Sequence, residues 1–396
     1  MFRKLLVLII TAFVDMVGLL MVLPLMPFYA RDLGAGSLMV TFMVVSFTAA
    51  QLLSAPLWGR FSDKYGRRPA LLVGLGAAAV AYVVFAYANT IWLLLLSRVV
   101  QGAGGGTVGV IQAYVADSTE PQNRAKALGW LSAATNVGVA LGPPIGSLAL
   151  LAGHQGPGLL AAVLCVINMA FAWKFLGESR DMEDARNSTR KPRASRDAIL
   201  RVITHAKDAG SRLIWIYAIA MGSFSAITAI LPLFLADQFG IGEHQVWIFF
   251  TYIGVISVIT RAGFLGRAVD RFGEARLSRI GLVLLAAGLA AYPFVHNYVL
   301  LAIVVALVPL GTAFTFPCVT SLLSRVISSS ERGLYMGVQQ TFGGLSRVIV
   351  PLWAGFSYDH FGRAIPFLTS AALVLVSLFL NLGVDDGRSP APAATS

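Results

Sequence analysis

Apolar segments long enough to cross a lipid bilayer recur along nearly the whole of this 396-residue sequence. A run of about 20 apolar residues spans the hydrocarbon core of a bilayer as a helix. Charged residues make up only 12% of the chain, which is about half their share in ordinary soluble domains. This pattern excludes a soluble, an intrinsically disordered or a disulfide-framed secreted protein, and it predicts an all-α polytopic membrane protein.

We predict twelve membrane-spanning helices, which leave little of the chain for a soluble domain. The ranges expected for them are 5–30, 37–58, 69–88, 91–115, 127–151, 158–176, 213–236, 245–266, 276–295, 298–323, 333–356 and 364–383.

Basic residues are concentrated in the loops after every second predicted span, and Arg31 and Arg363 are the exceptions on the other side. Because cytoplasmic loops of membrane proteins are rich in Lys and Arg, we expect both termini and the central loop in the cytoplasm. The formal net charge of +11 is then a consequence of topology. We therefore expect the lipid bilayer as a partner and no nucleic acid.

The two halves of the chain repeat each other at an offset near 208 residues. The pattern G-R-x-x-D-x-x-G at 59–66 returns at 266–273, and Leu-Pro-Leu at 23–25 returns at 231–233. Several matches in register indicate an internal duplication. Two parallel repeats of six helices predict two pseudo-symmetric six-helix bundles, a rocking transporter and a site near the midplane.

A basic segment divides the two halves. We expect an N-terminal bundle over 1–176, a cytoplasmic linker over 177–211, a C-terminal bundle over 212–384 and a disordered tail over 385–396. Within the linker, apolar residues between 199 and 203 fit either a short helix on the membrane surface or a solvated loop.

Asp15 lies about 15 Å into the first span and is the only acidic residue well inside any predicted span. An intramembrane carboxylate is costly and by default marks a proton or substrate site. The alternative is a neutral acid hydrogen-bonded to a neighbouring helix. Arg98, inside the fourth span, either tunes the protonation of Asp15 or binds a backbone carbonyl. Arg347 and Arg261 are candidates to bind an anionic group of a substrate. The alternative for Arg261 is that its side chain extends to the membrane–water interface.

The loop from Gly59 to Arg68 is the sharpest motif of the sequence. Its glycines allow a tight turn, Asp63 is expected to cap a helix N-terminus, and Arg67 is expected to pair with Asp117. We predict that these contacts hold the cytoplasmic side closed and break when it opens. The candidate gating residues are Gly59, Asp63, Gly66, Arg67, Asp117, Arg124, Gly142 and Pro143.

Polar and aromatic residues within the spans are candidates for substrate contacts, with core packing as the alternative for each. They are Asn136, Tyr252, Phe316, Gln339, Gln340, Phe342 and Arg347. The histidines and cysteines show no metal-ligand spacing, and no nucleophile–base arrangement occurs. We therefore expect no metal, no enzyme activity and no cofactor besides a proton gradient.

Several of these motifs resemble those of the major facilitator superfamily. The segment 59–68 resembles its signature between helices 2 and 3, and 96–102 resembles its helix-4 motif, whose arginine is linked to proton transfer. The segment 138–146 resembles the helix-5 motif of antiporters, except that Ser147 replaces its last glycine. The segment from Asp15 to Pro27 resembles the first-helix motif of twelve-helix drug:proton antiporters.

Among those exporters, the sequence is most similar to the tetracycline-efflux group. That group carries an acid just before a tyrosine in helix 3, whereas Ala81 precedes Tyr82 here. The difference favours a broader or more apolar substrate over metal–tetracycline.

The resemblance implies a monomeric, proton-coupled exporter of amphipathic small molecules in the bacterial cytoplasmic membrane, working by alternating access. The cargo class is then multidrug or tetracycline-like. Two alternatives stay open. One is a proton-coupled transporter of a sugar, a metabolite or a lipid, or an importer. The other is a membrane receptor that kept a transporter fold.

Overall fold

The computed structural model describes residues 2–105, 107–178, 195–328 and 331–382. Within these ranges every regular element is a helix and no strand occurs. Contacts divide the chain into two compact units. The first comprises residues 1–191 and 229–255, and the second comprises 192–228 and 256–396. The predicted domain boundaries stay a prediction.

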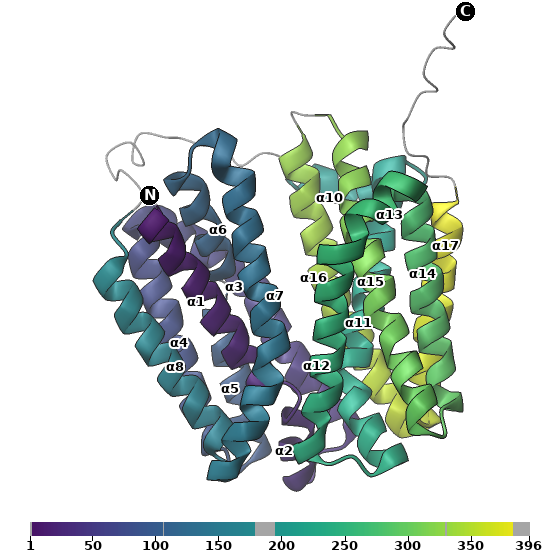
Figure 1. The fold of residues 1–396 in the computed structure, drawn as a ribbon, viewed down its shortest axis with the longest axis horizontal. Helices are drawn as coiled ribbons and strands as arrows, with labels where there is room; N and C mark the ends of the chain where they lie inside the picture. The colour runs from purple at the N-terminus through teal and green to yellow at the C-terminus, as the bar shows by residue number, and fades with distance from the viewer. Residues whose placement is uncertain (1, 106, 179–194, 329–330, 383–396) are drawn as a thin grey trace, which may run out of the picture. The chain divides into compact units, whose positions relative to one another are not determined.

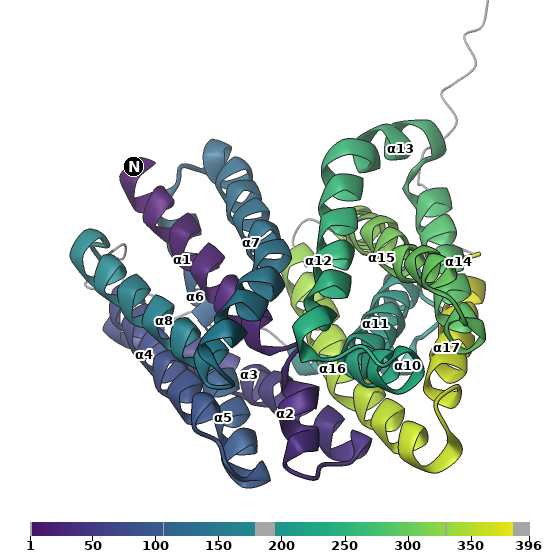
Figure 2. The ribbon, with the colours of Figure 1, turned by 60° about the horizontal axis from the view of Figure 1, so that its bottom comes forward.

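The first unit is built around α1, which packs against α7 and α8 (Figures 1 and 2). Behind them α4 contacts α8 and α5, and α3 contacts α5. The helices are α1 (Phe2–Val22), α2 (Met26–Asp32), α3 (Ser37–Tyr65), α4 (Arg67–Ala86), α5 (Ile91–Gly104), α6 (Thr107–Ser118), α7 (Pro121–Ala149) and α8 (Gly156–Phe175), with a 3-10 turn η1 (Leu150–Ala152).

In the second unit α14 packs against α15 and α17, and α16 contacts α17 and α10. The elements from this half of the chain are α10 (Ser195–Thr204), α11 (Ala209–Phe239), α12 (Glu243–Ile259), η2 (Thr260–Phe264), α13 (Leu265–Phe272), α14 (Glu274–Ala291), η3 (Tyr292–Phe294), α15 (Tyr298–Val326), α16 (Arg332–Phe361) and α17 (Ile365–Asn381). Residues 229–255, which include parts of α11 and α12, belong by their contacts to the first unit.

Within the described ranges, ten helical segments are long and apolar enough to cross a membrane. The eleventh and twelfth predicted spans correspond to α16, whose middle carries polar residues, and to α17, which has 17 residues. The count of twelve spans therefore stays a prediction. The all-α class is confirmed.

Two predicted spans are interrupted. The first is broken at residues 23–25, between α1 and α2, where Pro24 and Pro27 each lack a backbone N–H for the helical ladder. In the fourth, α5 ends at Gly104 and a turn follows at Gly105, in a glycine-rich stretch that lowers helix propensity.

The linker contains the short helix that its apolar residues allow, α10. Val202 on this helix is fully buried, and its carbonyl accepts a hydrogen bond from Trp215 Nε1 at 3.3 Å. The side of α10 that carries Val202 therefore packs against the rest of the protein. Residues 179–194 of the predicted linker and the predicted tail, 385–396, lie outside the described residues.

Glycines on α7 set the distance between α7 and α1. A Cβ atom added at Gly142 would lie 2.6 Å from Leu20 Cβ, and one at Gly138 would lie 2.8 Å from the Phe13 carbonyl oxygen. Neither position accepts a side chain without a shift of α1. Close packing through small residues is a property of membrane helices, and here it places α1, with Asp15, against α7.

Candidate functional site

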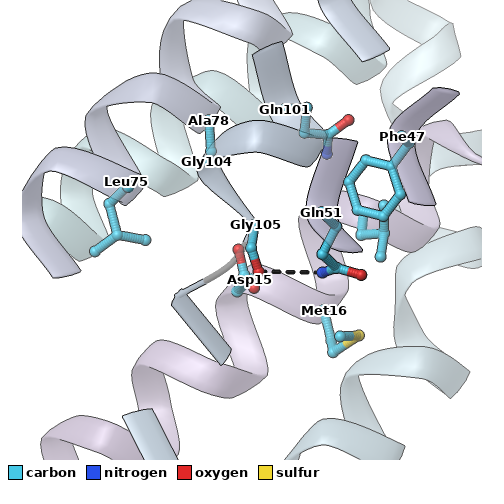
Figure 3. A pocket seen from close by; sticks show the side chains of 11 residues that line it. Asp15, Met16, Phe47, Gln51, Leu75, Ala78, Gln101, Gly104 and Gly105 are labelled. Atoms are coloured by element: carbon cyan, nitrogen blue, oxygen red, sulfur yellow. Dashed lines mark hydrogen bonds between the residues drawn. The ribbon is translucent and has the colours of Figure 1, made fainter. Parts of the chain in front are cut away.

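Asp15 lines a small cavity inside the first unit, shown in Figure 3. The cavity measures about 20 Å³, and Gln51 of α3 and Gln101 of α5 also line it. Gln51 Nε2 donates a hydrogen bond to the Gly105 carbonyl oxygen at 3.1 Å. A cavity of this size, with one carboxyl and two amide groups in its wall, has room for about one water molecule. Asp15 forms no ion pair with any described residue.

Arg98 is buried in the same unit, with 1% of its surface exposed. Its guanidinium carbon lies 5.2 Å from the centroid of the Phe85 ring, within range of a cation–π interaction. None of its three guanidinium nitrogens has a hydrogen-bond partner among the described residues. The backbone carbonyl contact that we considered for Arg98 is therefore not formed with that part of the chain.

Tyr82 of α4 lies near both charged residues. Its phenol interacts electrostatically with Asp15 and with Arg98, and its hydroxyl oxygen lies 3.0 Å from the point where a Cβ of Gly18 would stand. In the sequence, Tyr82 was noted only as the tyrosine that follows Ala81, the residue that departs from the tetracycline-efflux motif. The sequence feature that could have identified Tyr82 is a polar aromatic residue within an apolar span. Gln51 and Gln101 could have been identified in the same way, as polar residues within predicted spans.

The predicted pairing of Arg67 with Asp117 is confirmed. Arg67 Nε lies 3.1 Å from Asp117 Oδ2, and Arg67 Nη1 lies 3.1 Å from Asp63 Oδ1. The chain reverses direction between α3 and α4 at Gly66, whose φ of +103° favours glycine. The gating role of these residues stays a prediction. Gly59 lies in α3, Gly142 and Pro143 lie in α7, and the Arg124 side chain lies outside the described residues.

The predicted helix cap at Asp63 is wrong. The acid at the N-terminus of α4 is Glu178, whose carboxylate oxygens accept hydrogen bonds from the Arg67 and Arg68 backbone N–H groups at 2.9 and 3.2 Å. Asp63 lies in the last turn of α3, one turn before Arg67, so its carboxylate reaches the Arg67 side chain instead. Glu178 is 111 residues away from Arg67 in the chain, and no local motif indicated it.

The second half contains the same turn with the charges exchanged. Gly273, with φ of +76°, separates α13 from α14. Glu274 Oε1 then lies 2.8 Å from Arg325 Nη2 and accepts a hydrogen bond from Ser321 at 2.8 Å. At the repeat offset, Glu274 corresponds to Arg67 and Arg325 to Asp117. The duplication therefore extends to the position of an ion pair, with opposite polarity.

Three of the predicted substrate contacts lie near Tyr217 of α11. Gln340 Nε2 is 3.5 Å from the Tyr217 hydroxyl oxygen, and the Phe316 ring centroid is 5.4 Å from that of Tyr217. Arg347 and Arg261 both interact electrostatically with the Tyr217 phenol. Tyr217 itself is a residue that the sequence did not single out.

Two other predicted substrate contacts have different neighbours within the second unit. Gln339 is fully buried and interacts with Thr320 at 3.5 Å, and Phe342 packs against Trp215 with ring centroids 5.2 Å apart. For these two residues, packing within the bundle is the observed role. Asn136 of α7 and Tyr252 of α12 belong to the first unit. No group of three or more metal-ligating side chains is found in the described ranges.

A family model described as "Major Facilitator Superfamily" matches residues 8–264 and, in a second overlapping match, residues 213–395. The chain belongs to the major facilitator superfamily. Its resemblance to this superfamily in the loop and helix motifs is therefore confirmed over nearly the whole chain. The family and the fold are those of multi-pass membrane transporters and not of enzymes.

Relatives within the superfamily include resistance proteins. The chain is 27% identical over 362 residues to multidrug resistance protein 1 of Bacillus subtilis, covering 89% of each chain. It is 27% identical over 387 residues to the class C tetracycline resistance protein of Escherichia coli, covering 95% of this chain and 96% of that one. The crystal structure of the human organic anion transporter MFSD10 matches with a TM-score of 0.70 at 24% identity, over 96% of this chain and 99% of that one. At this identity, the structural likeness shows the fold alone.

Proposed function

We propose that this superfamily member is a proton-coupled exporter of amphipathic small molecules, of the multidrug or tetracycline-like kind. One observation carries the proposal: Asp15 is the only acidic residue well inside a predicted span, and it lines a cavity with Gln51 and Gln101 without an ion-pair partner among the described residues. Such a carboxyl group can gain and lose a proton during each cycle. The resistance proteins among the relatives support export as the direction.

In the proposed cycle, Asp15 takes a proton from the outer side and releases it to the cytoplasm. Protonation removes a negative charge from the same buried unit that holds the guanidinium of Arg98. The charge state of Asp15 thereby changes the electrostatic environment of Arg98. A buried charge is strongly favoured or disfavoured by such neighbours because the local dielectric constant is low. Alternating access then couples this change to cargo release.

The remaining parts of the proposal concern location and assembly. The basic residues of alternate loops support a bacterial cytoplasmic membrane protein with both termini in the cytoplasm. We propose a monomer that needs no cofactor other than the proton gradient.

The test compares Asp15→Asn with wild type in proteoliposomes that carry an imposed pH gradient. Two probes are used, tetracycline and a fluorescent lipophilic dye. We expect wild type to move at least one probe against its gradient, with proton movement in the opposite direction. Asp15→Asn should lose the proton-driven movement and keep probe binding. Asp32→Asn is the matched control, because Asp32 is an exposed acid at the end of α2.

Two results would contradict the proposal. Unimpaired proton-driven export by Asp15→Asn would remove Asp15 from the mechanism. Movement of the probe without any proton movement in wild type would exclude antiport and favour a different coupling.

A further inference from the structure

Two arginines of the C-terminal half lie inside predicted spans that contain no acid. Arg261 belongs to the eighth predicted span and Arg347 to the eleventh. The six predicted spans between 213 and 383 contain no Asp or Glu at all. A pair of positive charges within the membrane is therefore left without an opposite charge from its own spans. Such charges are expensive in a low-dielectric region unless an anion compensates for them.

The immediate surroundings of the two arginines do not compensate for them either. Neither side chain forms an ion pair or hydrogen bond with a described residue. The Nε atom of each is buried and without a partner in the described part of the chain. Both guanidinium groups have Tyr217 of α11 as a neighbour, and its hydroxyl group also donates hydrogen bonds. The three groups together offer N–H and O–H donors and no negative charge.

Local structure holds these donors together. Gly343 leaves room for Tyr217, because a Cβ atom there would lie 2.7 Å from Tyr217 Cε1. Gln340 and Arg347 lie on the same face of α16 as Gly343, at helical spacing. Arg261 lies in η2, a π-helical turn between α12 and α13 that contacts α15, the helix that carries Phe316. Turns of this kind interrupt the register of a helix and are frequent at functional sites.

Aromatic rings adjoin the donors. The Phe316 ring centroid lies 5.4 Å from that of Tyr217, and the Phe224 ring centroid lies 6.4 Å from that of Phe316. Phe316 is partly exposed and Gln340 is exposed, so the cluster is not sealed within the unit. An aromatic surface next to guanidinium groups suits a ligand with a flat apolar body and an oxyanion.

We propose that the cluster of Tyr217, Arg261 and Arg347 binds an oxyanion, a carboxylate or sulfonate, of an amphipathic aromatic cargo. The identity of the ligand as cargo rests on the proposed export function. The site itself does not, because binding to it requires neither Asp15 nor a proton gradient. An anionic lipid headgroup has the same chemistry as the cargo group, so the experiment separates the two sources.

The test uses three probes that share one ring: 2-naphthoate, neutral 2-naphthamide and cationic 2-naphthylmethylamine. Binding to the purified full chain is measured in nanodiscs of phosphatidylcholine. We expect 2-naphthoate to bind at least about ten-fold more tightly than either of the others, as expected for a charge-assisted hydrogen bond. Arg261→Gln and Arg347→Gln should each weaken 2-naphthoate binding by about ten-fold or more on the same ground. The matched control is Arg276→Gln, an exposed arginine at the start of α14, which should leave binding unchanged.

A measurement without any probe guards against a folding defect. If Arg347 is an uncompensated cation, Arg347→Gln should leave the Tm of the ligand-free protein unchanged or raised. A lowered Tm, with Arg276→Gln unaffected, would show a structural role for Arg347 and overturn the proposal.

Three further results would overturn it. The first is that the three probes bind equally well, and the second is that wild type does not bind 2-naphthoate. The third is that added phosphatidylglycerol raises the Tm of the protein and 2-naphthoate does not. The last of these would assign the cluster to a lipid headgroup. None of them changes the expectation for Asp15→Asn, so a failure here and a failure of proton coupling are distinguishable.

Discussion

Exchanging the charges of Arg67 and Asp117 should give the first half the polarity that Glu274 and Arg325 have in the second. The perturbation consists of Arg67→Glu, Asp117→Arg and the double variant. The second half shows that this polarity is compatible with the fold, since Glu274 follows Asp270 there at the spacing at which Arg67 follows Asp63. Each single variant should destabilise the first unit, and the double variant should recover part of the loss.

The size of the effect follows from the geometry of the pair. At the observed 3.1 Å between Arg67 Nε and Asp117 Oδ2, Coulomb's law gives about 1 kcal/mol in water and about 5 kcal/mol at an effective dielectric constant of about 20. The two side chains are 12% and 35% exposed, so screening favours the lower figure, in line with measured surface pairs. A single variant loses about 1 kcal/mol and adds repulsion of similar size, about 2 kcal/mol in all.

The assay is thermal unfolding of the purified protein, with Arg60→Glu, at an exposed arginine near the end of α3, as the control. About 2 kcal/mol should lower the Tm by about 4–8 °C, and Arg60→Glu should change it by much less. The double variant should regain about half of the loss. A double variant whose loss equals the sum of the two single losses would show that the two residues do not interact, and it would refute the reasoning.

Two further predictions concern packing and capping, both measured as changes in Tm. Gly142→Ala should destabilise by about 1–3 kcal/mol, because its Cβ would lie 2.6 Å from Leu20 Cβ, whereas Gly129→Ala, with nothing within 4 Å, should be neutral or stabilising. Equal effects of the two would contradict the close approach of α7 to α1. Glu178→Ala should lower stability by about 0.5–2 kcal/mol through loss of the α4 cap. Asp63→Ala should cost less, since the Asp63 carboxylate in its pair with Arg67 is exposed; a larger loss for Asp63→Ala would reverse this assignment.

The loop between α3 and α4 shows which contacts the local sequence predicts and which it does not. The pairing of Arg67 with Asp117 was predictable because both residues lie at helix ends on the same predicted side of the membrane. The acid that caps α4 was not predictable. Glu178 follows α8, and only the packing of α8 against α4 brings its carboxylate to the Arg67 and Arg68 N–H groups.

The candidate substrate contacts show the same limit at the level of single residues. Gln339 and Gln340 are adjacent in the sequence, yet Gln339 is fully buried and Gln340 is exposed beside Tyr217. Successive residues of a helix differ by about 100° in direction. The rotation of α16 about its axis therefore decides which glutamine is available to a ligand, and an apolar span with glycines on several sides does not specify that rotation.

Sequence alone determined the membrane-spanning helices, the internal repeat and the presence of Asp15 as the one acid within them, because hydrophobicity and spacing are local properties with large free energies in a bilayer. Tertiary structure decided which polar side chains meet. Tyr82 lies near Asp15 and Arg98, and Tyr217 lies near Arg261 and Arg347. These encounters depend on helix rotation and on close approaches set by glycines such as Gly142 and Gly343. Several rotations can satisfy the same apolar pattern, and only packing between helices selects among them.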